Sequence, residues 1–463
     1  MGAIGTGMAS SYGTTGYRNY VLIVLTLAYV FNFVDRVMIG ILAEPIIRHF
    51  SLTDTQFGLL GGIAFALFYT LVGVPVARLS ERVNRTWIIG AAILLWSIMT
   101  VLCGLAVSFW MLFLFRLGVG IGEAGLTPPA NSLISDYFAP SVRARALAIY
   151  AMGITLGQCA ANLFVGLTGA EVTWQQTFII IGLAGIPVGL LVLFTVDEPP
   201  RGYSEPVLTT GAHKSTFRES LKELKGKRSF WAVTLGSTTA SFVGYGMGSF
   251  TISFLVRNHE ITVSEAALWF MAPLAVSGAI GTWLCGNVVT RYAGGRNVVA
   301  LWLSAGALIV SMVAHVVAFN IGVLAYVFPL LLLANFFQYW YIGTMYAAVA
   351  TVAEVQTRAT AVAVMLFITN LLGYGLGPLF VGWLSDSLTA ANLSATSDLS
   401  LDACNAGREL LTADQLAVCT SASGSGLQVS VTVTVLVFFL AAIFFAYAAM
   451  TQHKDIPPAD TNA

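Results

Sequence analysis

The chain has 463 residues, of which 57% are hydrophobic and 10% are charged, and its 22 basic and 22 acidic residues leave a formal net charge of zero. Soluble globular domains carry about 25% charged residues. The composition therefore excludes a water-soluble domain and predicts an all-α polytopic membrane protein.

Twelve apolar stretches are long enough to cross a hydrocarbon core of roughly 30 Å, which takes about 20 helical residues. They follow a Gly/Ser/Thr-rich stretch, residues 1–19, which we predict to be a disordered tail. The first six lie near 20–42, 56–78, 86–108, 110–135, 143–168 and 176–196. The last six lie near 230–256, 264–290, 297–318, 322–350, 358–388 and 425–451.

This spacing divides the chain into two six-helix halves, 20–196 and 230–451. The polar stretch between them, 197–229, is predicted to be a linker with a short interfacial helix at 217–224, and residues 452–463 form a second tail. Transporters built from two such halves place the substrate path between them, near the midplane of the membrane.

The distribution of Lys and Arg predicts the orientation, because cytoplasmic loops carry an excess of both. With the amino terminus in the cytoplasm, every basic residue is cytoplasmic except Arg36 and Arg116 in the membrane and Arg48, Arg257 and Arg408 outside. We therefore expect a multi-pass protein of the cell inner membrane with both termini cytoplasmic.

Short basic loops follow the second and eighth spans, Ala77 to Arg85 and Gly286 to Arg296. They resemble the major facilitator superfamily signature Gly-x-x-x-Asp-Arg-x-Gly-Arg, although Glu81 and Thr290 stand where the family has the acid. The resemblance implies two pseudo-symmetric halves of the major facilitator fold. It also implies a conformational latch at the cytoplasmic ends, for which the candidates are Glu81, Arg82, Arg85, Arg143 and Arg145.

Four ionisable residues, Asp35, Arg36, Arg116 and Glu123, lie inside these spans, where charges are costly and usually face a bundle interior or a polar path. Asp35 is about 15 residues, or roughly 22 Å, from the cytoplasmic end of the first span, and Arg116 is roughly 9 Å from the outer end of the fourth. The two depths agree, so we predict that Arg116 reaches Asp35.

Further polar residues share the faces of these two spans. Glu123 lies two turns beyond Arg116 on nearly the same face, and Thr127 continues that line. Arg36 is turned roughly 100° from Asp35 around the helix, so it serves either the site or the packing of its neighbours.

An embedded carboxylate is a candidate proton carrier, because burial favours its neutral form and a nearby Arg favours its charged form. We therefore assign proton coupling to Asp35 and Glu123, and substrate binding to Arg36, Arg116, Asn32 and Thr127. The alternative is a fixed ion-pair network that only holds the first half together.

The carboxy-terminal half offers amides and aromatic rings without charge. Its candidate substrate-binding residues are Gln338, Tyr339, Tyr341, Asn370 and Tyr374. Charge on one side and aromatic surface on the other predict a site for an amphiphile. Core packing is the alternative for each ring.

Glycine and cysteine positions give three more expectations. Gly118, Gly120, Gly122 and Gly125 predict close packing of the fourth span, and Gly373 to Pro378 predict an interruption of the eleventh. Cys404 and Cys419 fall in an external loop, 389–424, and form either a disulfide or two free thiols. His315 is expected to pack, and Glu44 and Asp386 are expected to lie at the membrane interface.

The most specific pattern runs from Tyr29, Asn32, Asp35 and Arg36 to Arg116–Glu123, Pro128, Ser132 and Asp136–Phe138. It resembles the spinster family in a bacterial form. The resemblance implies transport of sphingosine 1-phosphate or lysophospholipids coupled to protons, with Asp35 as the protonation site. The animal substrates do not transfer automatically to a bacterial protein.

Three functions stay open at this point. The first is a proton-coupled secondary transporter of an amphiphilic, lipid-like substrate that works by alternating access. The second is a proton-coupled transporter of a small organic acid or drug-like compound, and the third is a membrane receptor or scaffold that does not translocate. We expect a monomer in contact with membrane lipid, without enzyme activity, metal, other cofactor or nucleic-acid partner.

Overall fold

The computed structural model describes residues 11–204, 217–293, 297–354, 357–406 and 411–456. Over these residues the secondary structure is helical, and twelve helical segments are long and apolar enough to cross a membrane. This confirms the predicted fold class. The tail residues 1–10 and 457–463, residues 205–216 of the linker and Gly294 to Arg296 of the second basic loop lie outside the described residues.

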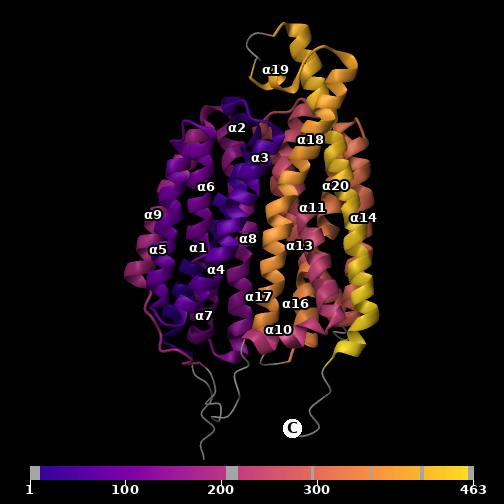
Figure 1. Cartoon of the computed structure of the whole chain (residues 1–463). Coiled ribbons are helices and arrows are strands. Elements are labelled where there is room, and N and C mark those ends of the chain that lie inside the picture. The colour runs from indigo at the N-terminus through magenta and orange to yellow at the C-terminus, as the bar shows by residue number, and fades with distance from the viewer. Residues whose placement is uncertain (1–10, 205–216, 294–296, 355–356, 407–410, 457–463) are drawn as a thin grey trace, which may run out of the picture. The chain divides into compact units, whose positions relative to one another are not determined.

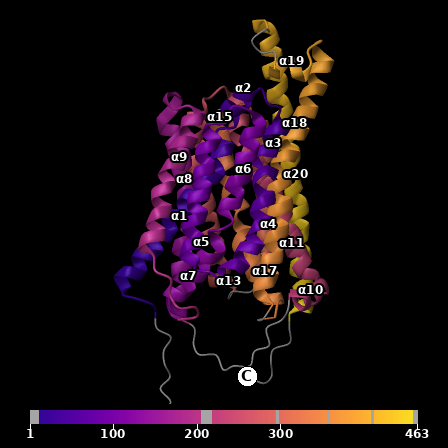
Figure 2. The ribbon, with the colours of Figure 1, turned by 60° about the vertical axis from the view of Figure 1, so that its left-hand side comes forward.

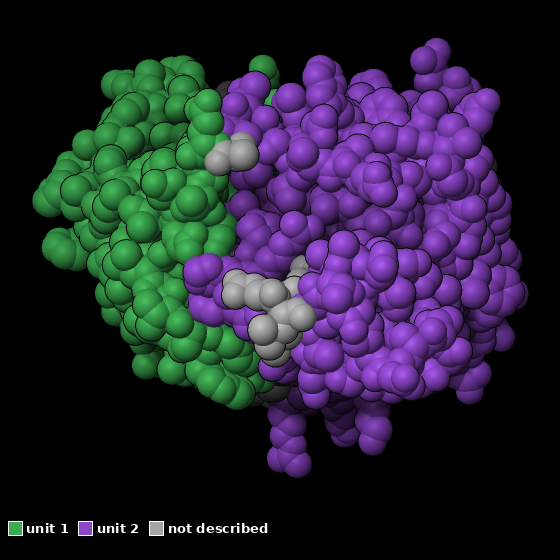
Figure 3. Space-filling view, turned by 90° about the horizontal axis from the view of Figure 1, so that it is seen from above, with its two compact units in different colours: residues 1–38, 67–164, 170–213 green, residues 39–66, 165–169, 214–463 purple. Residues whose placement is uncertain are grey.

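The chain divides into two compact units, coloured separately in Figure 3. Unit 1 comprises residues 1–38, 67–164 and 170–213, and unit 2 comprises 39–66, 165–169 and 214–463. The units therefore differ from the two halves predicted by span counting, because unit 2 takes in the end of the first span and the start of the second.

Unit 1 holds most of the first six spans (Figure 1). Its helices are α1 (Thr15–Ile41, up to Met38), α4 (Ile63–Ser80, from Leu67), α5 (Arg85–Gly104), α6 (Phe109–Glu123), α7 (Thr127–Tyr137), α8 (Pro140–Thr168, up to Phe164) and α9 (Trp174–Thr195). A 3-10 turn, η1 (Gly169–Glu171), joins α8 to α9.

Glycine allows α6 to lie close to α5, as predicted. A Cβ atom at Gly118 would lie 2.6 Å from the sulfur of Met99, and one at Gly122 would lie 2.7 Å from the amide nitrogen of Trp96. A side chain at Gly122 would force the helices apart, since carbon contacts optimally lie near 3.5–4.0 Å, and one at Gly118 would displace the Met99 side chain. The fourth span is not one straight helix, because the turn Ala124–Leu126 separates α6 from α7. Thr127 is therefore the first residue of a new helix, α7.

Unit 2 begins with two short helices from the amino-terminal part of the chain, α2 (Ala43–Phe50) and α3 (Asp54–Gly61). The others are α10 (Phe217–Lys225), α11 (Arg228–His259), α12 (Val263–Glu265), α13 (Ala272–Ala293), α14 (Asn297–Asn320), α15 (Leu324–Gln338), α16 (Trp340–Val352), α17 (Arg358–Ile368), α18 (Gly375–Thr396), α19 (Leu401–Ala406) and α20 (Ala413–Asp455). Two π-helical turns, η2 (Ala266–Met271) and η3 (Thr369–Tyr374), interrupt the eighth and eleventh spans.

α3 belongs to unit 2 because it packs directly on α18. A Cβ atom at Gly58 would lie 2.4 Å from the carbonyl oxygen of Pro378, and one at Gly382 would lie 2.1 Å from that of Asp54. The two backbones touch where neither helix has a side chain. η3 begins within the eleventh span, just before the Gly/Pro stretch that predicts an interruption there.

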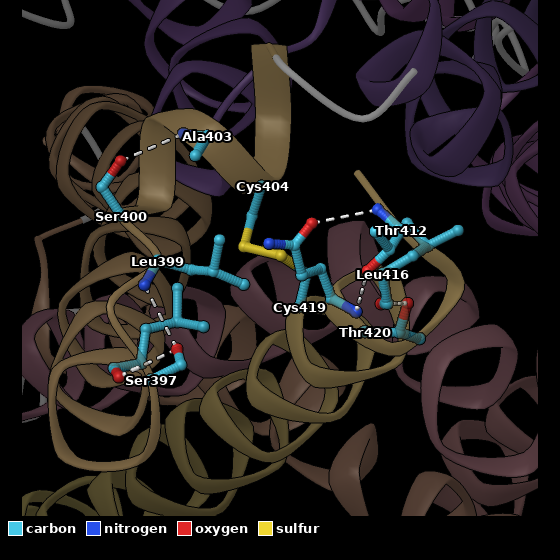
Figure 4. Close-up of a disulfide and its surroundings, with 11 residues drawn as sticks. Ser397, Leu399, Ser400, Ala403, Cys404, Thr412, Leu416, Cys419 and Thr420 are labelled. Carbon is cyan, nitrogen blue, oxygen red and sulfur yellow. Dashed lines mark hydrogen bonds between the residues drawn. A yellow bond between two sulfur atoms is a disulfide. The ribbon is translucent and has the colours of Figure 1, made fainter. Parts of the chain in front are cut away.

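The predicted external loop 389–424 is mostly helical. α18 continues to Thr396 and α20 starts at Ala413, so that the short α19 lies at the outer ends of both helices (Figures 1 and 2). A disulfide joins Cys404 in α19 to Cys419 in α20 (Figure 4). Leu393 and Ala422 pack against it as a small core of this cap, whose described residues are 397–406 and 411–424.

Candidate functional site: two buried ion pairs

The four charged residues of the spans form two separate ion pairs inside unit 1. Asp35 and Arg36 are neighbours on α1, and Arg116 and Glu123 are two turns apart on α6. All four side chains are buried, and Arg116 and Glu123 have no exposed surface. Together they carry no net charge.

The first pair is the one that the matching depths predicted. Nη1 of Arg116 donates to Oδ1 of Asp35 over 3.1 Å. The hydroxyl of Thr100 on α5 donates to Oδ2 of the same carboxylate. Both oxygens of Asp35 therefore have a donor, and the donors come from two different helices. Sequence reasoning missed Thr100, which carries no signal that separates it from other threonines in the spans.

The second pair gives Arg36 a definite place in the site. Its Nε and Nη2 atoms donate to Oε2 of Glu123 over 3.1 and 2.9 Å, and Nη2 lies 3.5 Å from Oδ1 of Asn32. The 100° turn between Asp35 and Arg36 thus lets the two meet different residues of α6.

Two polar atoms beside Arg36 have no hydrogen-bond partner. Oε1 of Glu123 accepts no bond, and Nδ2 of Asn32 donates none, within the part of the chain that the structure describes. An unpaired buried polar atom costs about 1–3 kcal/mol. One acceptor and one donor are therefore available to a proton, a water molecule or a polar group of a ligand.

Aromatic rings surround this charged group within the same unit. The Arg36 guanidinium lies over the rings of Phe33 and Tyr69, 4.8 and 4.7 Å from their centroids. Tyr29 stacks on Tyr150 of α8 at 4.4 Å. Unit 1 thus carries aromatic rings as well as charge, whereas the sequence predicted charge in the amino-terminal half and aromatic surface in the carboxy-terminal half. Tyr69 and Tyr150 were missed because their own helices show no pattern that turns them inward.

Unit 2 holds the predicted aromatic and amide set. Tyr374, on η3, is buried and stacks on Tyr245 of α11 at 4.2 Å. The Tyr341 hydroxyl lies 3.2 Å from that of Ser241. Gln338, buried at the end of α15, and the half-buried Tyr339 and Asn370 complete the set. Gln338 and Tyr339 lie at the break between α15 and α16, and Asn370 and Tyr374 lie on the π turn. All but Tyr341 therefore lie where a helix departs from regular geometry.

The five latch candidates divide into one buried residue and four at least partly exposed ones. Arg85 starts α5, is 1% exposed, and binds Asp136 at 2.5 Å and Glu198 at 2.7 Å. Its guanidinium also donates to the Ser132 hydroxyl over 2.8 Å. Both carboxylates belong to unit 1, so Arg85 ties α5 to α7 and to the segment after α9 inside that unit. Glu81, Arg82 and Arg145 are exposed, and Arg143 is half-buried.

A second charged cluster, centred on Arg257, was not predicted. Arg257, near the end of α11, binds both oxygens of Asp54 at 2.8 Å, Glu44 at 2.7 Å and the Ser423 hydroxyl at 3.0 Å. Asp386 of α18 accepts the amides of Asp54 and Thr55 at 3.0 and 2.7 Å, at the amino terminus of α3, where an anion is favourable.

The Arg257 cluster therefore holds α2 and α3 to α11, α18 and α20 within unit 2. Glu44 and Asp386 were expected to lie at the membrane interface. Glu44 binds Arg257 of α11, and Asp386 binds the start of α3, so these contacts join segments far apart in sequence and no local pattern reveals them.

The Major Facilitator Superfamily model matches residues 25–378. An MFS-type efflux pump of Mycolicibacterium smegmatis is 31% identical over 369 residues, which cover 79% of this chain and 84% of the pump. The sphingosine-1-phosphate transporter SPNS2 of Danio rerio is 27% identical, over 81% of this chain and 77% of that protein.

A solved structure extends the similarity to nearly the whole chain. It is the crystal structure of a bacterial homolog to the human lysosomal transporter spinster, in an inward-facing and unoccupied conformation. The sequences are 39% identical, the TM-score is 0.88, and the match covers 96% of this chain and all of the other. These relatives are transporters and not enzymes, in line with the sequence prediction.

Proposed function

Since this chain belongs to the major facilitator superfamily, and within it to the group of the spinster proteins, we propose that it is a proton-coupled secondary transporter of an amphiphilic, lipid-like substrate. The observation that carries this proposal is the group of two ion pairs in unit 1, whose four charges sum to zero. Aromatic rings surround this group, and Oε1 of Glu123 and Nδ2 of Asn32 have no hydrogen-bond partner within the described residues. The site offers charge for a headgroup and rings for an apolar chain.

The proposed proton site is Asp35, with Glu123 as the second acid. Neutralising Asp35 removes the anion that holds Arg116, so a proton and the ion pair compete for the same carboxylate. Arg116 cannot release its own proton near neutral pH, so it must find another anion when Asp35 is neutral. An anionic substrate group would supply one.

The proposed headgroup site is Arg36 with Asn32 and Glu123. A phosphate or carboxylate can replace Glu123 on the guanidinium, because Arg binds both in bidentate geometry. The proton would then be held by Glu123, whose Oε1 is already unbonded. The aromatic set of unit 2 is proposed to contact the apolar part of the substrate.

We further propose alternating access, with both termini in the cytoplasm and the chain acting as a monomer in the cell inner membrane. The excess of Lys and Arg in the loops on the side of the termini supports this orientation. The Arg257 cluster would have to open in any state that separates α2 and α3 from α11 and α18.

A second candidate is export of a drug-like compound. The name of the Mycolicibacterium smegmatis relative, an efflux pump, favours it. Its proton chemistry would be the same, and the two candidates differ in whether the headgroup of the substrate must be anionic.

Transport measurements in proteoliposomes test both candidates. We expect uptake or release of a fluorescent lysophospholipid that responds to an imposed pH gradient, and little transport of ethidium. Arg36→Ala should weaken transport of an anionic lysophospholipid more than that of a neutral analogue. Transport of ethidium alone would favour the second candidate, and absence of flux for both probes would overturn the lipid proposal.

A further inference from the structure

A groove on unit 2, separate from the charged site of unit 1, combines two cations with an apolar wall. It lies between α11 and α20, has a volume of about 310 Å³, and is lined by Lys225, Arg228, Trp231, Leu235, Phe444 and Tyr447.

The helices place these side chains together by their ordinary spacing. Arg228, Trp231 and Leu235 lie three and four residues apart along α11, and Phe444 and Tyr447 lie three apart on α20. Such residues share a helix face. Lys225, the last residue of α10, adds the second cation next to Arg228.

The Trp231 ring has a fixed orientation in this wall. Its indole nitrogen donates to the carbonyl oxygen of Leu224 over 3.1 Å, and the ring meets Phe230 edge to face at 5.2 Å. Trp and Tyr prefer the boundary between the headgroups and the hydrocarbon, because each has an apolar body and a polar tip. The groove therefore has the composition of a membrane interface.

Two cations line the charged end of the groove. Neither Lys225 nor Arg228 forms an ion pair or a side-chain hydrogen bond within the described residues. The nearby acids are already engaged, because Glu223 binds Lys227 at 2.8 Å and Asp455 accepts the Ser229 amide and hydroxyl at 2.6 and 2.7 Å.

The apolar end of the groove continues onto exposed apolar surface. Leu235 and Tyr447 are each 41% exposed, and Ile443 and Met450 on α20 are also exposed. In a membrane-spanning chain, such side chains face acyl chains. The groove thus leads from unpaired positive charge to hydrocarbon.

We propose that this groove binds an anionic glycerophospholipid, with its phosphate between Lys225 and Arg228 and an acyl chain along Leu235 and Tyr447. Basic pockets between helices at the membrane surface have the charge that such headgroups need. This lipid is a bound neighbour of the protein and not its transported substrate.

Fluorescence quenching by brominated lipids tests the proposal on the full chain in nanodiscs. Trp231 is one of 10 tryptophans, so its fluorescence is obtained by subtracting the emission of Trp231→Phe from that of the wild type. We expect this difference to be quenched more strongly by brominated phosphatidylglycerol than by brominated phosphatidylcholine. Equal quenching by both lipids would overturn the proposal.

Charge-removing variants separate the groove from general attraction to the membrane. Each cation near the surface contributes about 1 kcal/mol, so Lys225→Gln/Arg228→Gln should reduce the preference for phosphatidylglycerol by about 30-fold. The control Arg218→Gln/Lys222→Gln removes the same charge from exposed positions of α10 outside the groove. It measures the general attraction to the membrane and should reduce the preference less than the groove variant does. An equal loss in both variants, or displacement of the lipid by millimolar inorganic phosphate, would contradict the proposed occupant.

Discussion

The ion pair of Asp35 and Arg116 can be tested by removing one or both of its members. Arg116 is fully buried, Asp35 is 2% exposed, and the charged atoms lie 3.1 Å apart. Removing one partner of such a pair leaves a buried charge uncompensated and costs about 3–5 kcal/mol. We expect Arg116→Met to fall in that range and Asp35→Asn near its lower end, because the amide oxygen of Asn still accepts a bond from Arg116.

The double variant Asp35→Asn/Arg116→Met leaves no unpaired charge. It should therefore be more stable than the sum of the single effects predicts, by about 3 kcal/mol. Thermal or chemical unfolding in detergent, followed by tryptophan fluorescence, measures the three variants. The control is the double variant Asp35→Asn/Glu198→Gln, for which the two losses in unfolding free energy should add. Glu198 binds Arg85, and Arg85 is roughly 22 Å along α5 from Thr100, which binds Asp35.

The same variants separate a structural pair from a proton site. Asp35→Asn should still fold and bind substrate, and its transport should no longer respond to pH. A variant with the pH response of the wild type would refute the role of Asp35 in proton coupling. Additive losses in the double variant would refute the ion pair as a source of stability.

Three further perturbations test other parts of the molecule. Arg257→Met should lower the melting temperature more than Ser423→Ala, because it leaves Glu44 and Asp54 without their cation. Equal shifts in the two variants would show that Arg257 does not stabilise these two carboxylates. Gly382→Ala should cost about 1–3 kcal/mol of stability, because the new methyl group overpacks against the backbone of Asp54. Gly306→Ala is the control and should not destabilise, because a Cβ there meets nothing within 4 Å. Equal melting temperatures for the two variants in thermal unfolding would contradict the α3–α18 contact. Cys404→Ser/Cys419→Ser should cost about 3 kcal/mol, because the bond closes a 15-residue separation, and an unchanged melting temperature in oxidising and reducing buffer would contradict this.

Hydropathy, helix rise and charge distribution were enough to predict the twelve spans and the Asp35–Arg116 pair. Both depend on position along a helix axis, which sequence gives directly. The partner of Arg36 depends on how α1 and α6 are rotated against each other, and sequence does not contain that angle. Glu123 was therefore treated as a separate acid, although it binds the residue next to Asp35.

Contacts between span ends were the least predictable. Glu44, Asp54 and Asp386 look like ordinary interfacial acids, because polar residues are expected there whether or not they bind anything. Arg257 makes them a cluster only after four helices are placed. Arg85 shows the same limit, since its loop motif pointed to a latch and its contacts with Asp136 and Glu198 lie inside unit 1.

The membership of residues 39–66 in unit 2 affects how the protein can be cut and recombined. A chimera joined in the linker exchanges two halves of the sequence, but it also separates α3 from the α18 on which it packs and Glu44 from Arg257. Such an exchange keeps the α3–α18 contact only when the donor has a glycine at the position of Gly382, and it keeps the ion pair of Glu44 only when the donor has an arginine at the position of Arg257. Residues 39–66 are therefore better exchanged together with the carboxy-terminal half.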